Sequence, residues 1–269
     1  MIVFSFAAVL FYCGASILFF RYLGKDSRDK QTRSQWLLMS LGLLNHGALL
    51  YMQLGLSEGV DLRLGIAASL VTWSLALILG LVAIFRPVEI LGIAVLPLAV
   101  LVIVYNLLFP GEIHFLPTVY PIARFHLLIA ILSFGCLGLA VLQSIAFSWQ
   151  DFHLRAQHMN PLVGRMPPLQ TMESIMFQLL NLGFILLTIT LLTGVFFHEA
   201  ISGRPFELNH HILLSLIAWI IFAVLLVGRQ LFGWRGRTAA RLLLSGFVTL
   251  VLGYFGTRFV LEVILGRSP

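Results

Sequence analysis

Three histidines lie close together in the segment FFHEAISGRPFELNHHILLSLIAW, which joins two long apolar runs of the sequence. They are His198, His210 and His211. Imidazole is the commonest metal-binding side chain, and it also exchanges protons near neutral pH. Two further histidines, His46 and His126, lie within or at the edge of other apolar runs. The chemistry of this chain therefore depends on where these five imidazoles are placed.

Apolar runs of about 20 residues recur along the whole chain, which is 59% hydrophobic and only 10% charged. Each run is long enough to cross a bilayer core of roughly 30 Å, and the runs are continuous rather than alternating, which is typical of helices. The sequence predicts an all-α polytopic membrane protein, a bundle of about eight transmembrane helices forming a single transmembrane domain over residues 1–269. The predicted spans are residues 1–23, 36–56, 64–85, 88–109, 124–149, 174–200, 211–233 and 241–265.

Lys and Arg are distributed unevenly over the predicted loops. Most of these 17 residues fall on the side of the membrane that the chain reaches after its first span. Because cytoplasmic loops are enriched in Lys and Arg, we expect both termini to lie outside. The same bias accounts for the net charge of +6 without a nucleic-acid partner. Cys13 and Cys136 lie in different spans without metal-ligand spacing, so we expect them to be packing residues.

On this topology the histidines gather toward the outer side. His126, His198 and His211 lie just inside the outer ends of three spans, and if these helices are neighbours their imidazoles share one cleft. His46 lies roughly 15 Å deep in the second span. An ionisable residue at that depth indicates either a functional site or a neutral imidazole bonded to a neighbouring helix, for example through Asn45. The other histidines are predicted to be loop residues: His114, His153, His158 and His210.

These side chains suit haem better than zinc. Zinc sites usually take four ligands, often with carboxylate or thiolate, and the sequence has no HExxH motif. Haem needs one or two axial imidazoles, a flat apolar slot and cations for its propionates. The chain has 22 Phe residues, and several arginines lie on the predicted outer side. The inventory of side chains therefore favours haem over zinc, with Arg124 and Arg258 among the arginines on the propionate side.

Several segments resemble a known family. From ARFHLLIAILSFGCLGLAVLQSIAF through MESIMFQLLNLGFILLTITLLTGVFF to LSLIAWIIFAVLL, GWRGR and GYFGTR, the chain is similar to the cytochrome c assembly proteins of the CcsA, CcmC and HemX type. It is most similar to their YpjD/HemX-like branch. The likeness is strongest over residues 64–265, which include SLVTW, and it extends forward to NHGALLY. It implies eight spans, a location in the bacterial inner membrane and haem handling at the outer face.

The resemblance is incomplete at the loop that presents haem in the family. Haem-transfer members carry a tryptophan-rich WWD loop between two outer histidines, whereas this chain has LNHHILLSLIAW there, and only Trp219 matches. By position, His126 matches the family's first outer histidine and His46 its intramembrane histidine. A later family histidine falls near residues 227–229, where this chain has none. We expect His198 and His211, which bracket the same loop, to serve as local ligands instead. The resemblance thus implies haem b as the cofactor, and the site we predict for it consists of His126, His46, His211, His198, Arg124 and Arg258, with His126 and His211 binding the metal.

We therefore expect an integral membrane protein that handles haem, with a cytochrome maturation or haem-biosynthesis protein as its partner, membrane lipid around it and no nucleic acid. The alternative is a haem-free membrane scaffold, or a regulator of haem biosynthesis or membrane-complex assembly. A transporter is less well supported, because ionisable residues within the spans are scarce. We expect no enzymatic activity, since the outer loops hold no nucleophile–base–carboxylate set and no phosphate-binding glycine loop.

Overall fold

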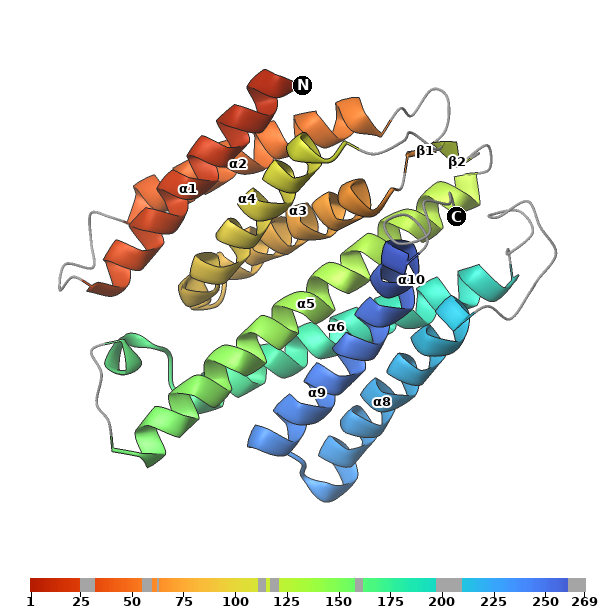
Figure 1. Cartoon of the computed structure of the whole chain (residues 1–269). Helices are drawn as coiled ribbons and strands as arrows, with labels where there is room; N and C mark the ends of the chain where they lie inside the picture. The colour runs from red at the N-terminus through yellow and green to blue at the C-terminus, as the bar shows by residue number, and fades with distance from the viewer. Residues whose placement is uncertain are drawn as a thin grey trace.

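The structure is a computed structural model that describes residues 1–24, 32–54, 60–61, 63–110, 115–116, 121–157, 162–196 and 210–260. Nearly all of these residues are helical (Figure 1). Seven helical segments within these ranges are long and apolar enough to cross a membrane, judged by length and composition. The prediction of an all-α polytopic membrane protein is confirmed.

Eight long helices follow one another along the described part of the chain. They are α1 (Ile2–Gly24), α2 (Thr32–Gln53), α3 (Leu64–Ala83), α4 (Gly92–Leu108), α5 (Pro121–Arg155), α6 (Leu169–Phe196), α8 (His210–Phe232) and α9 (Gly236–Val251). The last of these continues through the π-helix η3 (Leu252–Gly256) into α10 (Thr257–Phe259). Short 3-10 turns, η1 (Glu89–Leu91) and η2 (Val163–Arg165), precede α4 and α6, and two-residue strands, β1 (Val60–Asp61) and β2 (Phe115–Leu116), pair antiparallel.

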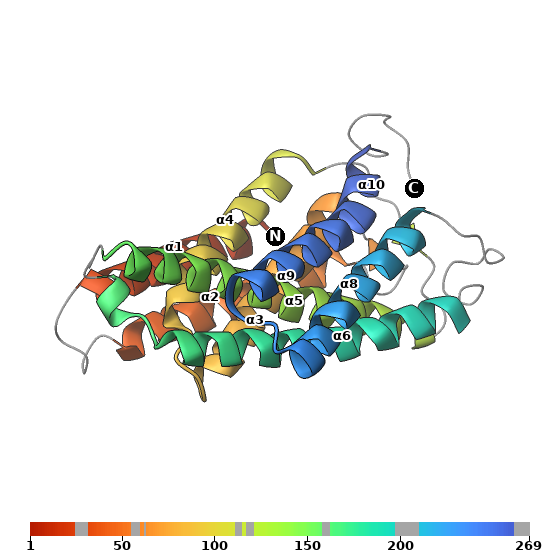
Figure 2. The same cartoon turned by 90° about the horizontal axis from the view of Figure 1, so that it is seen from below.

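Each predicted span corresponds to one of these helices, but α2 is less apolar than the other seven. Asn45 and His46 in the middle of α2 lower its hydropathy. It nevertheless packs along α1 and against α3, and it lies among the other helices in both views (Figures 1 and 2). Helix α5 runs from Pro121 to Arg155 and so extends beyond the predicted residues 124–149 at both ends.

The helices form two groups that meet along α3 and α5 (Figure 1). Helices α1 to α4 pack against one another, and α5, α6, α8 and α9 form the second group. A glycine permits the close approach between the groups, since a Cβ atom at Gly135 of α5 would lie 2.8 Å from Ile78 Cδ1 of α3. One hydrophobic core extends through both groups, from Tyr12 and Leu79 to Phe222.

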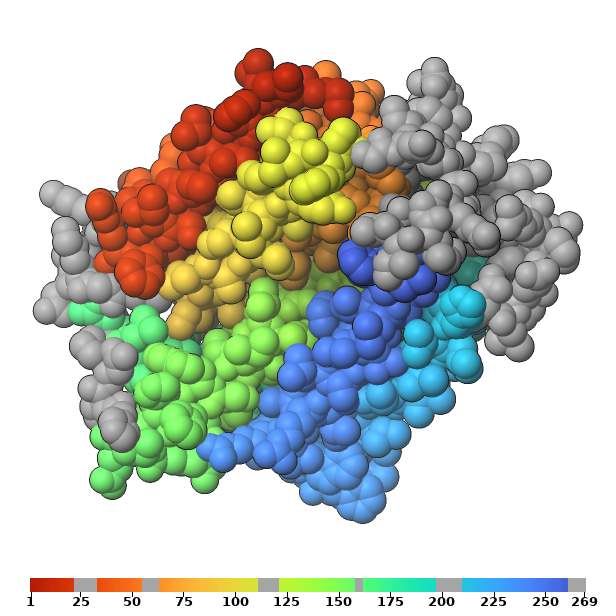
Figure 3. All heavy atoms as spheres, in the orientation of Figure 1, coloured from red at the N-terminus to blue at the C-terminus, as the bar shows by residue number. Residues whose placement is uncertain are grey.

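Large apolar side chains cover the outside of the bundle. Figure 3 shows one face, on which α1, α4, α5, α9 and α8 lie side by side. Exposed residues on these helices include Leu10, Leu101, Leu128, Leu231 and Leu244. A soluble protein rarely exposes so much contiguous apolar surface, whereas lipid tails cover it without cost. The surface therefore agrees with the membrane assignment made from the helices.

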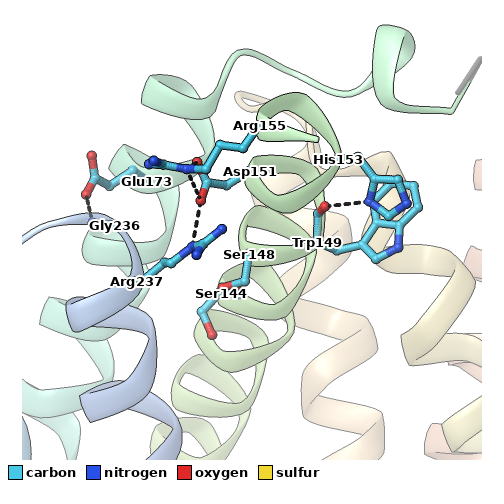
Figure 4. Close-up of polar contacts among 9 residues, drawn as sticks. All are labelled: Ser144, Ser148, Trp149, Asp151, His153, Arg155, Glu173, Gly236 and Arg237. Carbon is cyan, nitrogen blue, oxygen red and sulfur yellow. Dashed lines mark hydrogen bonds and ion pairs between the residues drawn. The ribbon is translucent and has the colours of Figure 1, made fainter. Parts of the chain in front are cut away.

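At one end of the bundle, polar contacts tie α5, α6 and α9 together (Figure 4). Asp151, near the end of α5, accepts hydrogen bonds from Nε of Arg155 and from Nε of Arg237 in α9, each at 2.9 Å. Glu173 of α6 accepts a bond of 2.8 Å from the backbone N–H of Gly236. Gly236 has a φ of +61°, which suits glycine in the tight turn between α8 and α9. We call this end, defined by these five residues, the arginine end.

Candidate functional site

The opposite end of the bundle brings two of the predicted imidazoles together. The first turns of α5 and α8, the last turn of α6, and η3 with α10 converge there (Figures 1 and 2). His126 comes from α5 and His211 from α8. The His211 imidazole lies within electrostatic reach of both His126 and Arg258. We call this region, defined by these three residues, the histidine end.

His126 is held in place by α6. Its Nδ1 lies 2.9 Å from Thr193 Oγ1. The Thr193 hydroxyl also lies 2.9 Å from the Ile189 carbonyl oxygen and 3.0 Å from that of Thr190, and these oxygens can only accept. The single hydroxyl proton therefore goes to the helix backbone, and Thr193 Oγ1 accepts a bond from Nδ1–H of His126. This assigns the neutral tautomer in which Nε2 of His126 carries the lone pair.

His211 packs against the π-helix η3. Its ring meets the ring of Tyr254 edge to face, with centroids 5.6 Å apart and planes at 62°. The guanidinium carbon of Arg258 lies 5.8 Å from the centroid of the same tyrosine ring. A Cβ atom at Gly253 would lie 3.6 Å from the His211 carbonyl oxygen, so the backbones of η3 and α8 approach closely here. His211, Tyr254 and Arg258 thus form a continuous series of contacts.

Aromatic side chains continue this region toward the middle of the bundle. Phe134 of α5 contacts Tyr254, with ring centroids 6.1 Å apart, and Phe255, with centroids 5.9 Å apart. Phe134 lies about two turns along α5 from His126. Rings from α5 and η3 therefore pack below the two imidazoles, and such walls are typical of sites that take flat apolar groups.

Trp219, which matched the family's haem-presenting loop, lies inside the helix packing. It is part of α8, and its ring stacks on Phe184 of α6 with centroids 5.5 Å apart. Its indole N–H donates to Thr188 Oγ1 at 2.9 Å. Since Trp219 follows His211 by eight residues, it lies about 12 Å further along the helix axis. Its contacts hold α8 against α6.

His46 belongs to the group of α1 to α4 and is fully buried. Its Nε2 lies 2.8 Å from Ser69 Oγ of α3, and its Nδ1 lies 3.4 Å from the Tyr12 hydroxyl of α1. Asn45 bonds instead to the Leu41 carbonyl of its own helix. Both nitrogens of His46 are engaged, so this imidazole joins three helices and presents no free lone pair to a metal. This geometry matches the expectation of a neutral imidazole bonded to neighbouring helices, with hydroxyl groups as partners in place of Asn45.

The other predicted residues lie apart from these contacts. Arg124 is exposed at the start of α5, and because it precedes His126 by two residues it points about 200° away around the helix. His210 is exposed at the first residue of α8. At the arginine end, His153 Nδ1 donates to the Trp149 carbonyl at 2.9 Å (Figure 4). Three histidines lie outside the described residues: His114, His158 and His198.

The two imidazoles described at the histidine end, with aromatic rings beside them, fit haem. Within the ranges that the structure describes, no three His, Cys, Asp or Glu side chains gather as they would around a metal ion. Two imidazoles are enough for the axial positions of haem iron, while the porphyrin is held mainly by apolar contacts. His126 and His211, with aromatic rings beside them and Arg258 within reach, meet these needs.

Sequence analysis missed Thr193 and Tyr254. The available signal for Thr193 was its place in TITLLTG, in the outer half of the predicted span 174–200. Tyr254 lies in GYFGTR, where glycines flank two aromatic residues. The π-helix that directs this tyrosine toward α8 follows no sequence pattern that we used.

The family model for the cytochrome C assembly protein matches residues 35–265. Inner membrane protein YpjD of Escherichia coli strain K12 is 35% identical over 140 residues, which is 52% of this chain and 52% of that protein. An uncharacterized 28.8 kDa protein of Azospirillum brasilense is 32% identical over 143 residues, again 52% of each chain. Cytochrome c biogenesis protein CcsA of Crocosphaera subtropica is 31% identical over 126 residues, 47% of this chain and 36% of that protein.

The chain thus spans about half the length of the first of these curated relatives, and no solved structure matches it. The family match, however, covers most of the chain, from the first turn of α2 to beyond α10. It includes His126, His211 and the elements that hold them. The chain therefore belongs to the cytochrome c assembly protein family.

Proposed function

We propose that the protein binds haem b at the histidine end, with His126 and His211 as iron ligands, and handles haem for cytochrome c assembly in the bacterial inner membrane. One observation carries this proposal: the bond from Nδ1–H to Thr193 leaves Nε2 of His126 with a lone pair that can bind a metal. His211 lies within electrostatic reach of the same imidazole. A histidine that binds a metal commonly donates its other ring N–H to such an acceptor. Membership of the family, and a relative named as a cytochrome c biogenesis protein, support the proposal.

The side chains around the two imidazoles have distinct tasks in this proposal. His126 and His211 would hold haem, which would supply an iron ion that imidazole nitrogens can ligate. Phe134 and Tyr254 provide apolar surface for the porphyrin, which excludes water from it. Arg258, which packs over Tyr254, is the guanidinium suited to a propionate, because such charge-assisted bonds are strong.

Two histidines from different helices would leave the iron with no open position. This arrangement suits storage or transfer of haem rather than reaction with oxygen. We therefore propose that the protein is a binding protein and not an enzyme. We also propose that its partner is a protein of cytochrome maturation or of haem biosynthesis.

The test is a haem titration of the purified protein in detergent, followed by absorption spectra. We expect a Soret band and the sharp visible bands of low-spin haem from the wild type. His126→Ala and His211→Ala each remove one axial ligand, so we expect their spectra to shift to the high-spin form. His153→Ala is the matched control, because His153 bonds to the Trp149 carbonyl at the arginine end and its loss should leave the spectrum unchanged.

Two results would contradict the proposal. One is a wild-type protein that shows no Soret band after haem is added. The other is a His126→Ala protein with the spectrum and affinity of the wild type. The first result would favour the haem-free alternative, a membrane scaffold or regulator of haem biosynthesis or membrane-complex assembly.

A further inference from the structure

We propose that Tyr254 is a positioning residue for His211, and that the π-helix η3 exists to place it there. The contact between the two rings fixes the orientation of the His211 imidazole. This inference rests on the proposed haem site and adds to it a residue that does not itself bind the iron. Three features of the structure support it.

The first feature is the interruption of a regular helix at the site. Helix α9 continues as a π-helix over Leu252–Gly256 and then returns to α-helical geometry as α10. A π turn inserts one extra residue, so it rotates the side chains that follow by about 100° relative to an uninterrupted helix. Thr257 Oγ1 donates to the Gly253 carbonyl at 2.9 Å and stabilises the widened turn. Such turns occur frequently at functional sites, because they redirect side chains.

The second feature is the close contact between η3 and the first two turns of α8. A Cβ atom at Gly253 would lie 3.0 Å from Leu214 Cβ and 3.8 Å from the backbone nitrogen of Ser215, so only glycine fits without a shift. The Ser215 hydroxyl donates to the His211 carbonyl at 2.9 Å, which secures this turn of α8. The backbones that carry Tyr254 and His211 are therefore fixed relative to each other. The contact between their rings follows from this fixed backbone geometry.

The third feature is that Tyr254 is held from both sides. Phe134, on the helix that carries His126, meets the Tyr254 ring at 59°, and Arg258 lies over the same ring. Aromatic pairs keep a preferred angle because ring edges are positive and ring faces negative, and a cation over the face adds to this. Turning the Tyr254 ring would break these contacts, so its orientation beside His211 is fixed. The same residue thus touches the helices of both iron ligands.

The experiment compares haem binding and the low-spin EPR spectrum in Tyr254→Leu, Tyr254→Phe and wild type, all in detergent. The EPR spectrum depends on the angle between the two imidazole planes, so it reports the orientation of His211 directly. We expect Tyr254→Leu to weaken haem binding about three- to tenfold, as the loss of an aromatic pair predicts, and to change the EPR spectrum. Tyr254→Phe keeps the ring edge, so it should stay within about twofold of wild type.

Tyr51→Leu is the matched control, because Tyr51 lies on α2 and is 71% exposed. Its affinity and EPR spectrum should equal those of wild type. If Tyr254→Leu yields no monodisperse protein, Tyr254→Met fills the space without a ring edge and carries the same expectation. A leucine or methionine variant with wild-type affinity and EPR spectrum would overturn this inference while leaving the haem site in place. A wild-type protein without a Soret band would instead remove the proposed function itself.

Discussion

Replacing Thr193 by valine tests the hydrogen bond that assigns the tautomer of His126. Valine is close to threonine in shape and is branched at the same carbon, so it removes the hydroxyl and largely keeps the packing. Thr193 is buried, with 9% of its surface exposed, so water does not readily replace the lost oxygen. The Nδ1–H of His126 then loses the acceptor that lies 2.9 Å away. The imidazole is left free to rotate or to change tautomer.

The expected size of the effect follows from this geometry. An unsatisfied donor in a buried site costs about 1–3 kcal/mol, and loss of the partner of a metal-binding histidine typically lowers affinity by about 10- to 100-fold. His126 itself is only partly buried, which places the effect at the lower end. We therefore expect Thr193→Val to weaken haem binding about tenfold, or about 1.4 kcal/mol. Thr193→Ser keeps the hydroxyl and should stay close to wild type.

Two measurements check this expectation. Haem titrations followed at the Soret band give the affinities, and ¹⁵N NMR of labelled histidine gives the tautomer of His126 without haem. Thr190→Val is the control, since Thr190 lies about one turn before Thr193 and its hydroxyl donates to the Leu186 carbonyl of its own helix. If Thr193→Val binds haem as tightly as Thr190→Val does, and His126 keeps its tautomer, the argument from the Thr193 bond is wrong.

Two further predictions concern parts of the molecule away from the site. Ser69→Ala leaves Nε2 of the buried His46 without its partner, so we expect the free energy of unfolding to fall by about 1–3 kcal/mol while the Soret band stays unchanged. Thermal melts and haem titrations on the same sample measure both, and a lost Soret band would mean that His46 belongs to the haem site. Asp151→Asn removes the carboxylate that binds Arg155 and Arg237, whose side chains are 70% and 47% exposed. Because water and salt screen such exposed pairs, we expect the free energy of unfolding to fall by only about 1 kcal/mol, and by less at high salt. Melts at low and high NaCl test this, and a loss independent of salt would rule out an electrostatic origin.

The helices could be predicted because their cause is local. Continuous apolar runs of sufficient length predict spans, and each of the eight predicted spans corresponds to a helix. The end of α5 was predicted too early, because Asp151 and Arg155 interrupt the apolar run although they support the helix as an i, i+4 ion pair. Apolar composition marks where lipid begins and ends, whereas backbone hydrogen bonds can carry a helix further into water.

The partners of the polar residues could be predicted only in part. The sequence placed His126 and His211 at one depth, and the structure brings them into one region. The sequence did not identify Ser69 and Tyr12 as the partners of His46, because those contacts join residues far apart in the chain. Hydroxyl groups are common in membrane helices, so their presence alone does not show which of them faces a given imidazole. That choice depends on how the helices rotate against one another.

The length of α5 has a mechanical consequence. Its 35 residues extend about 52 Å, well beyond a bilayer core of roughly 30 Å, and a tilt within the usual range does not hide the excess. His126 and Asp151 lie on this one rod, about 38 Å apart along its axis. Adding or deleting a single residue between them would turn one end by about 100° relative to the other. The number of residues between His126 and Asp151 is therefore constrained by the need to keep both side chains facing their partners. This holds even for positions in between whose side chains contact only lipid.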